Sequence, residues 1–278
     1  MSIQSGADES TGYLPRLFIV VSTWATQLVR PPSQAYRAEA VQRLTRNTVL
    51  TAVIAALLIV TLMVWFDARE IALMPPRGTA GLWPFRILTS FGKDSYVLLL
   101  AAILLLAVGL VAPALHGPAR RSLLVIGLRL QFVLFAVSVP LVAGELLKWI
   151  AGRGRPFVGG AADAFNFVPF AGTEAHASFP SAHSITAFAL AFALAAVWPR
   201  LRGLMIAYAL VIAFTRLVLL AHHPSDVVAG ATVGVIGAMW VRYWFAVRGL
   251  GFSISSGGII SPVAGGALKG VAAGPPAP

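Results

Sequence analysis

Long apolar segments alternate with short polar ones along most of this chain. The apolar segments are close in length to the roughly 20 residues that a helix needs to cross about 30 Å of hydrocarbon. In lipid, such segments must be helical, because only a helix satisfies the backbone polar groups within one segment. We therefore predict an all-α protein that crosses a membrane six times. The predicted spans are residues 48–66, 96–115, 122–147, 181–198, 204–220 and 227–245.

The segments outside these spans differ in pattern. Near the N-terminus, apolar side chains recur at helical spacing, at Leu17, Val20, Val21, Trp24 and Leu28. For residues 1–45 this spacing suggests an interfacial helix on the cytoplasmic face, with a partly ordered tail as the alternative. Residues 249–278 are rich in Gly, Ala and Pro, and we expect a disordered tail there. Residues 46–248 then form one helical membrane domain.

Composition agrees with a membrane protein. Hydrophobic residues make up 58% of the 278 residues and charged residues only 11%, more apolar surface than one water-soluble core would bury. The net charge of +11 does not indicate nucleic-acid binding, since the basic residues are scattered and not gathered into a stripe with aromatics. There is no cysteine, which excludes disulfide and thiol chemistry.

The scattered basic residues predict a topology instead. They are frequent before the first span, between the second and third, between the fourth and fifth, and after the sixth. The positive-inside rule makes that side cytoplasmic, with both termini inside and loop 159–178 outside. The loop after the first span goes against this trend, with Arg69, Arg77, Arg86 and Lys93.

Three polar clusters lie on the outer side, at residues 148–156, 179–183 and 215–226, and the first and third of them carry further cations. Clusters at one membrane depth can face one cavity, and ionisable groups there are candidates for function. Lys148, Arg155 and Arg216 would supply positive charge to that cavity. Ser181 would cap a helix whose first N–H groups, at Ala182 and beyond, point at the same anion. This collection suits a phosphate better than a carboxylate.

Histidines add reactivity to these clusters. In one helical frame His222 and Asp226 are four residues apart and share a face. A carboxylate that accepts one ring N–H leaves the other nitrogen free to attack phosphorus. His183, from another helix, could protonate the departing oxygen.

The same residues resemble the three-part signature of the type 2 phosphatidic acid phosphatase (PAP2) superfamily. The signature is read here at Lys148, Arg155, Pro156, Pro180, Ser181, His183, Arg216, His222 and Asp226. The resemblance implies a six-helix lipid phosphatase that needs no metal or other cofactor. His222 would be the nucleophile, Asp226 its partner and His183 the general acid. Lys148, Arg155, Ser181 and Arg216, with the backbone of Ala182, would hold the phosphoryl oxygens.

Two positions depart from the family pattern. Ala182 stands where the family usually has Gly, and Thr215 where it usually has Ser. Ala182 keeps a backbone N–H and Thr215 a hydroxyl, so we expect activity to survive unless the backbone at Ala182 is strained.

Neighbouring polar residues receive simpler interpretations. We expect Arg153 and His176 to lie on the solvated surface, and Glu145 to pair with Lys148 one helical turn away. His223 should cap the turn before the sixth span or touch a lipid headgroup. Pro224 fits the first turn of that helix, which could then start only there.

The leading hypothesis is a phosphatase acting on a membrane lipid phosphate or diphosphate at the outer face of a bacterial cytoplasmic membrane. Candidate substrates are phosphatidic acid, phosphatidylglycerol phosphate, undecaprenyl diphosphate and lipid A phosphates. One alternative is lipid phosphotransfer by the same fold. Another is a transporter or a channel that binds a metal through His183, His222, His223 and Asp226, although three nearby cations would repel a metal.

Overall fold

The structure of the protein is a computed structural model that describes residues 12–32, 35–156, 158 and 163–263. Within these residues the chain is almost entirely helical. The α-helices are α1 (Tyr13–Val29), α2 (Arg37–Trp65), α3 (Asp67–Leu73), α4 (Trp83–Ser90), α5 (Asp94–Val111), α6 (Gly117–Ala151), α7 (Ala182–Val197), α8 (Arg202–Val218) and α9 (Pro224–Val247). The short 3-10 helices are η1 (Ala80–Leu82), η2 (Ala112–Ala114), η3 (Glu174–His176) and η4 (Pro199–Leu201), and two strands, β1 (Phe252–Ile254) and β2 (Ile260–Pro262), form a hairpin.

Each of the six predicted spans coincides with a helix, namely α2, α5, α6, α7, α8 and α9. Within the described part of the chain, five helical segments are long and apolar enough to cross a membrane, and α7 is the shorter one, with 16 residues. At 1.5 Å per residue α7 is about 24 Å long. The predicted all-α polytopic membrane fold is confirmed, while α7 is shorter than the hydrocarbon layer.

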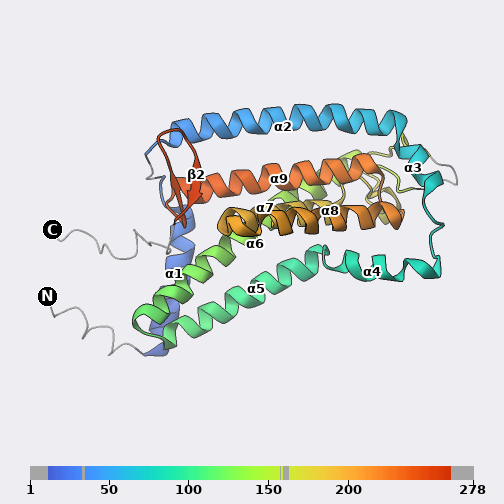
Figure 1. The fold of residues 1–278 in the computed structure, drawn as a ribbon. Helices are drawn as coiled ribbons and strands as arrows, with labels where there is room; N and C mark the ends of the chain where they lie inside the picture. The colour runs from blue at the N-terminus through green and yellow to red at the C-terminus, as the bar shows by residue number, and fades with distance from the viewer. Residues whose placement is uncertain (1–11, 33–34, 157, 159–162, 264–278) are drawn as a thin grey trace.

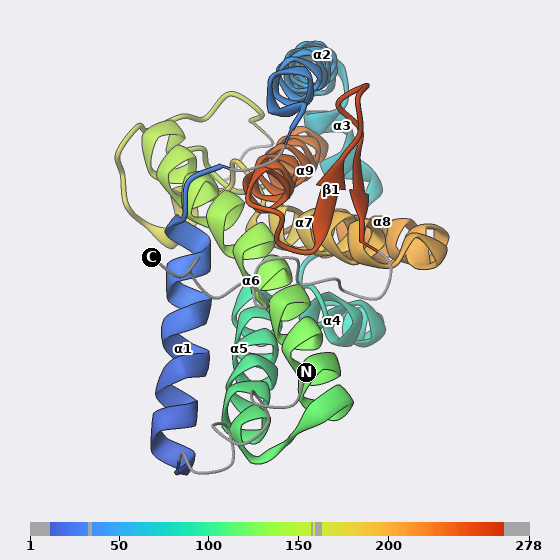
Figure 2. The same cartoon turned by 90° about the vertical axis from the view of Figure 1, so that its left-hand side faces the viewer.

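α7 lies in the interior of the bundle, packed against α6, α8 and α9 (Figures 1 and 2). Glycines on α9 allow the closest approach. A Cβ on Gly230 would lie 2.5 Å from the backbone oxygen of Ser181, and one on Gly234 would lie 2.5 Å from that of Ile185. Small residues at such interfaces let two helix backbones pack closely in a membrane. The contact brings the start of α7 against the start of α9.

The bundle has two ends of different character (Figure 1). We call the motif end the one that carries α3, α4, the 152–180 segment and the α8–α9 turn. We call the hairpin end the opposite one, where α1 runs across the ends of the longer helices. Trp24 of α1 lies against Gly109 and Gly127 there, and the Tyr13 hydroxyl donates a hydrogen bond to the Leu110 carbonyl. Residues Tyr13–Val29 of the N-terminal segment are therefore helical, and the place of this helix at the membrane interface stays a prediction.

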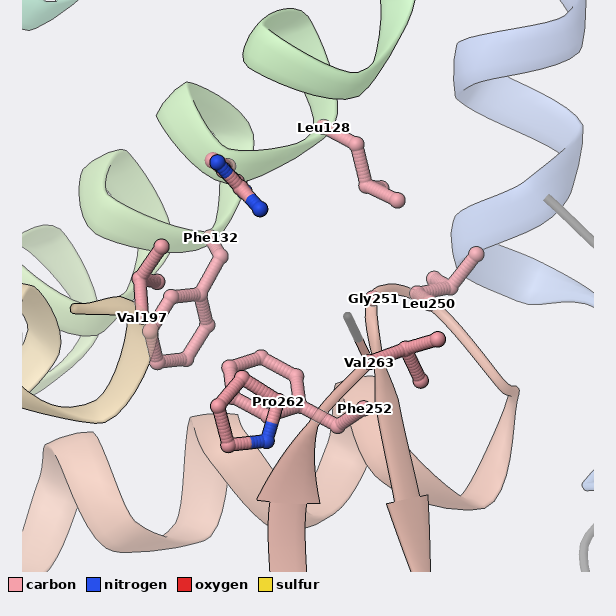
Figure 3. Close-up of a pocket in the computed structure, with 9 residues that line it drawn as sticks. Leu128, Phe132, Val197, Leu250, Gly251, Phe252, Pro262 and Val263 are labelled. Carbon is pink, nitrogen blue, oxygen red and sulfur yellow. The ribbon is translucent and has the colours of Figure 1, made fainter. Parts of the chain in front are cut away.

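The expectation of a disordered tail from residue 249 onward was wrong for its first part. Phe252 and Ile254 are buried and Ser253 is exposed, the alternation of a half-buried strand. Phe252 packs edge-on against Phe132 of α6, with 4.8 Å between the ring centroids. Figure 3 shows these rings around a cavity of only about 20 Å³. Aromatic packing therefore orders a segment whose composition suggests disorder, while residues 264–278 lie outside the described part.

Candidate active site

The three polar clusters predicted from the sequence meet at the motif end. Lys148 lies in the last turn of α6, His183 in the first turn of α7, and Arg216 in the last turn of α8. His183 lies within electrostatic range of Lys148, Arg155 and Arg216, and also of Lys93. His222, in the α8–α9 turn, also lies within electrostatic range of Arg155 and Arg216. The two histidines therefore share two cations, Arg155 and Arg216.

A backbone carbonyl orients the ring of His222. Its Nδ1 atom lies 2.8 Å from the carbonyl oxygen of Ser178, and the ring is 3% exposed. Because a carbonyl only accepts, Nδ1 carries the proton and Nε2 keeps its lone pair. Burial, together with the charge of Arg216, lowers the pKa of His222 well below its usual range. The ring is therefore neutral near pH 7, with an unprotonated nitrogen available as a nucleophile.

Asp226 does not hold the His222 ring by a hydrogen bond, contrary to the sequence interpretation. The distance from His222 Nδ1 to Asp226 Oδ2 is 3.9 Å, too long for a hydrogen bond. Asp226 Oδ2 instead accepts from the Ser178 hydroxyl at 2.6 Å and from the His223 backbone N–H at 2.9 Å. Helix α9 starts only at Pro224, so His222 is outside the helix and its ring does not share a face with Asp226.

His223 caps α9, as predicted. It occupies the N-cap position, with Pro224 at the first helical position, and its ring and Asp226 form a reciprocal capping box. The His223 ring nitrogen Nδ1 lies 3.2 Å from Asp226 Oδ2. Asp226 thus fixes the turn that carries His222, and through Ser178 it also fixes the carbonyl that orients the His222 ring.

The prediction that Arg153 lies on the solvated surface was wrong. Arg153 has no exposed area, and it pairs with Asp226 at 2.6 Å and with Asp67 at 2.8 Å. It also donates to the Ser225 hydroxyl and to the Ala164 carbonyl. A buried guanidinium needs carboxylates and further hydrogen bonds to offset the loss of water. The loop sequence around Arg153 carries no sign of two carboxylates supplied by distant helices.

Asp67 and Ser225 are site residues that the sequence reasoning missed. Asp67 opens α3 and is fully buried, and it accepts from the Ser225 hydroxyl at 2.5 Å and from its N–H at 3.1 Å. One signal could have found Asp67: it follows the first apolar span directly, at the membrane depth of the other clusters. The hydrogen bonds between Asp67 and Ser225 hold α3 against the start of α9.

Three of the phosphate-binding candidates, Lys148, Arg155 and Arg216, line two different cavities. Lys148 pairs with Glu145 at 2.5 Å, as predicted, and lines a cavity of about 280 Å³ together with His176, which is half-buried rather than on the open surface. Arg155 and Arg216 line a second cavity, of about 270 Å³.

Both arginines of the second cavity are positioned by neighbouring residues. Arg155 pairs with the exposed Glu174 at 3.1 Å. Arg216 donates to the Thr89 hydroxyl of α4 at 2.7 Å, a contact that the sequence reasoning missed.

The start of α7 keeps donors for a ligand. Ser181 is its N-cap residue, as predicted, but its side chain makes no capping hydrogen bond. Its buried Oγ has no partner among the described residues, whereas its backbone N–H donates to the Asp226 carbonyl at 3.0 Å. The first N–H groups of a helix have no partner within the helix. The Ser181 hydroxyl and the N–H groups after it are therefore suited to bind phosphoryl oxygens.

The two departures from the family pattern have simple local explanations. Ala182 is the first residue of α7 and is not among the residues with positive φ, so a side chain there causes no backbone strain. The Thr215 hydroxyl donates to the Ile212 carbonyl of its own helix at 2.6 Å. Among the described residues, no group of three or more His, Cys, Asp or Glu side chains is arranged to hold a metal ion.

Comparisons with known proteins show which sequences this chain resembles. The sequence profile of the PAP2 superfamily matches residues 129–250. Lipid A 1-phosphatase of Rhizobium johnstonii is 35% identical over 198 residues, which cover 70% of this chain and 80% of that protein. Lipid A 1-phosphatase of Rhizobium etli is 36% identical over 199 residues, covering 70% and 84%. The bacitracin transport permease protein BcrC of Bacillus licheniformis is 28% identical over 171 residues, covering 59% and 79%. No solved structure matches this chain.

Proposed function

Because this chain belongs to the PAP2 superfamily, we propose that it hydrolyses the phosphate or diphosphate group of a membrane lipid through a phosphohistidine. The observation that carries the proposal is the ring of His222. It is neutral, its Nδ1 proton is held by the Ser178 carbonyl, and it shares Arg155 and Arg216 with His183.

In the first step, Nε2 of His222 attacks phosphorus. The N–P bond forms while the bond from phosphorus to the lipid oxygen breaks, and its electron pair leaves with that oxygen. His183 gives the departing oxygen a proton. Arg155, Arg216 and the donors at Ser181 bind the nonbridging oxygens, where charge develops in the transition state. The Ser178 carbonyl stabilises the His222 ring as it becomes positive.

In the second step, water replaces the histidine. His183 now takes a proton from the water, whose oxygen bonds to phosphorus, and the N–P bond breaks to return neutral His222. Inorganic phosphate is the product. Asp226 is a positioning residue in both steps, because its direct contacts are Ser178, His223 and Arg153 rather than the reacting ring.

The substrate class follows from the fold. The site lies at the end of a bundle with long apolar helices, so a phosphate on a lipid can reach it from the membrane surface. The relatives named as lipid A 1-phosphatases support a lipid A phosphate among the candidates, beside phosphatidic acid, phosphatidylglycerol phosphate and undecaprenyl diphosphate. The scattered basic residues favour a cytoplasmic membrane with the site facing the periplasm or the exterior. Cysteine labelling at Gly160 from outside the cell tests this orientation.

Phosphate release by purified protein in detergent tests the function. We expect His222→Ala to abolish turnover and the matched neighbour variant His223→Ala to keep a measurable part of it. Rapid quenching with labelled lipid phosphate should trap acid-labile phosphate on His222. Activity should persist in EDTA, because no step requires a metal. A strict requirement for zinc or magnesium, or turnover by His222→Ala, would refute the mechanism.

A further inference from the structure

Two arginines outside the family signature, Arg77 and Arg86, line the same cavity as Arg155 and Arg216. Ala221, which directly precedes His222, also lines it. No acidic side chain is among the lining residues in the described part of the chain. The cavity therefore gathers four guanidinium groups and is lined by the residue that precedes the proposed nucleophile.

Arg86 is held in place relative to Arg216. It lies on α4, three residues before Thr89, so the two side chains share a helix face. The Thr89 hydroxyl accepts the hydrogen bond from Arg216. Helix α4 is fastened to α8 by an edge-on contact between Phe85 and Phe214, with 6.2 Å between the ring centroids. The distance from Arg86 to the signature arginine is thus set by packed helices.

Arg77 comes from a different segment, the turn between α3 and η1. Its positive charge lies close enough to the guanidinium group of Arg216 for the two to repel each other. In the described structure neither Arg77 nor Arg86 has a hydrogen bond or an ion pair from its side chain, and both are exposed. Arg153, in contrast, is paired with two carboxylates. Like charges around one cavity repel each other, and a bound anion would relieve this repulsion.

The cavity also has room for more than one phosphoryl group. Its volume is about 270 Å³, far above the roughly 10–15 Å³ that a single water needs. A single phosphoryl group, with four heavy atoms, would leave much of that space empty. Arg77 and Arg86 line this same space, which leaves room for a second anion beside the first.

We propose that Arg77 and Arg86 form a second anion subsite, which binds the phosphoryl group next to the one that is transferred. The proposal rests on the proposed function and makes a lipid diphosphate the preferred substrate over a lipid monophosphate. The terminal phosphoryl group binds Arg155 and Arg216. As the His222 N–P bond forms, the bond from the bridging oxygen to the terminal phosphorus breaks, and its electron pair stays on the departing lipid monophosphate. Arg77 and Arg86 stabilise that growing negative charge.

The test compares a diphosphate and a monophosphate of the same lipid in a neutral detergent. Hydrogen bonds between charged groups are stronger than those between neutral groups. We therefore expect the double variant Arg77→Gln/Arg86→Gln to lose about 100-fold or more in kcat/KM for the diphosphate. For the monophosphate we expect a loss of less than about 3-fold. Arg69→Gln is the matched control, since Arg69 is an exposed arginine of α3 that does not line the cavity.

Equal losses for both substrates, or no loss for either, would overturn the subsite. Assays in lipid vesicles show whether the arginines bind the second phosphate of the substrate itself or the phosphate of a neighbouring lipid. A loss confined to vesicles with anionic lipid would assign the arginines to the membrane surface and overturn the proposal. Calorimetry with inorganic diphosphate and orthophosphate tests the subsite without turnover. Wild-type protein should bind diphosphate at least about tenfold more tightly than orthophosphate, and the double variant should lose this preference.

The two proposals fail in different ways. Wild-type protein that releases no phosphate from any lipid would refute the proposed function, while the calorimetric preference would still decide the subsite. Wild-type protein that turns over both lipids, with no difference caused by the double variant, would refute the subsite alone.

Discussion

The motif end and the hairpin end of the bundle are held together by different kinds of contact. At the motif end, Arg153, Asp67 and Asp226 form fully buried ion pairs. At the hairpin end, Phe132 packs edge-on against Phe245 and Phe252, with ring centroids 5.4 and 4.8 Å apart. Apolar packing stabilises without directional bonds, whereas buried ion pairs pay a desolvation cost and are often no more stable than an apolar core.

The two kinds of contact correspond to different roles of the two ends. Buried ion pairs fix directions, and the motif end needs fixed directions because Ser178 and the α8–α9 turn orient the His222 ring. The hairpin end carries none of the predicted site residues, so packing alone is sufficient there. Changes at the motif end should therefore reduce activity, and changes at the hairpin end should reduce stability while leaving the site intact.

The largest expected effect follows from Arg153→Met. The substitution leaves Asp67 and Asp226 buried without their cation, which costs about 3–5 kcal/mol. We expect kcat to fall at least about 100-fold and the protein to unfold at lower temperature. Arg153→Lys, which keeps the charge, should recover part of both. A variant that keeps full kcat despite the lost pairs would show that the cluster does not position the site.

The matched change at the hairpin end is Phe252→Ala. Removing a buried Phe side chain costs about 3–5 kcal/mol, so we expect a fall in Tm of about 10 °C in detergent. The kcat for lipid phosphate should stay within about 2-fold at a temperature where the variant is folded. A fall in kcat as large as that of Arg153→Met would remove the distinction between the two ends.

The pH dependence of the reaction is sensitive to the His222 environment. Because the pKa of His222 is lowered by burial and by Arg216, its neutral form persists as pH falls below the usual histidine value near 6.5. The acid limb of kcat/KM should therefore lie below pH 6.5, with rate lost as pH falls through that lowered pKa. A pH profile of lipid phosphate release measures it. An acid limb at or above pH 6.5 would contradict the neutral, buried ring.

The smallest effect concerns Glu70, a buried carboxyl of α3 whose oxygens have no hydrogen-bond partner among the described residues. Burial, with the charges of Asp67 and Asp226, raises its pKa to about 8. The folded protein then binds a proton that the unfolded chain releases above pH 4.5, so stability should fall as pH rises from about 4.5 to 8. We expect Glu70→Gln to flatten this slope and to raise Tm by a few degrees at pH 8. Equal slopes in thermal unfolding of both proteins would contradict the raised pKa.

Much of the fold and of the site could be predicted from the amino-acid sequence alone. Apolar length located all six helices of the predicted spans, since hydrocarbon thickness and backbone hydrogen bonding restrict a membrane segment to one conformation. The residue type of Pro224 indicated that α9 could start there, because proline fits the first turn of a helix, and of the two roles open to His223 the structure shows the cap. The meeting of the three clusters followed from their common membrane depth.

Only the tertiary structure decided which side chains are partners. Arg153 is buried because Asp67 and Asp226, 86 and 73 residues away in sequence, close around it. Ser178 replaces Asp226 as the direct partner of the His222 ring because the residues just before α7 lie against the α8–α9 turn. Arg86 joins the signature arginines because α4 docks on α8, and Arg77 reaches the same cavity from the turn between α3 and η1. Local sequence sets helix length and caps through contacts within a few residues, whereas these partners depend on how separate helices pack.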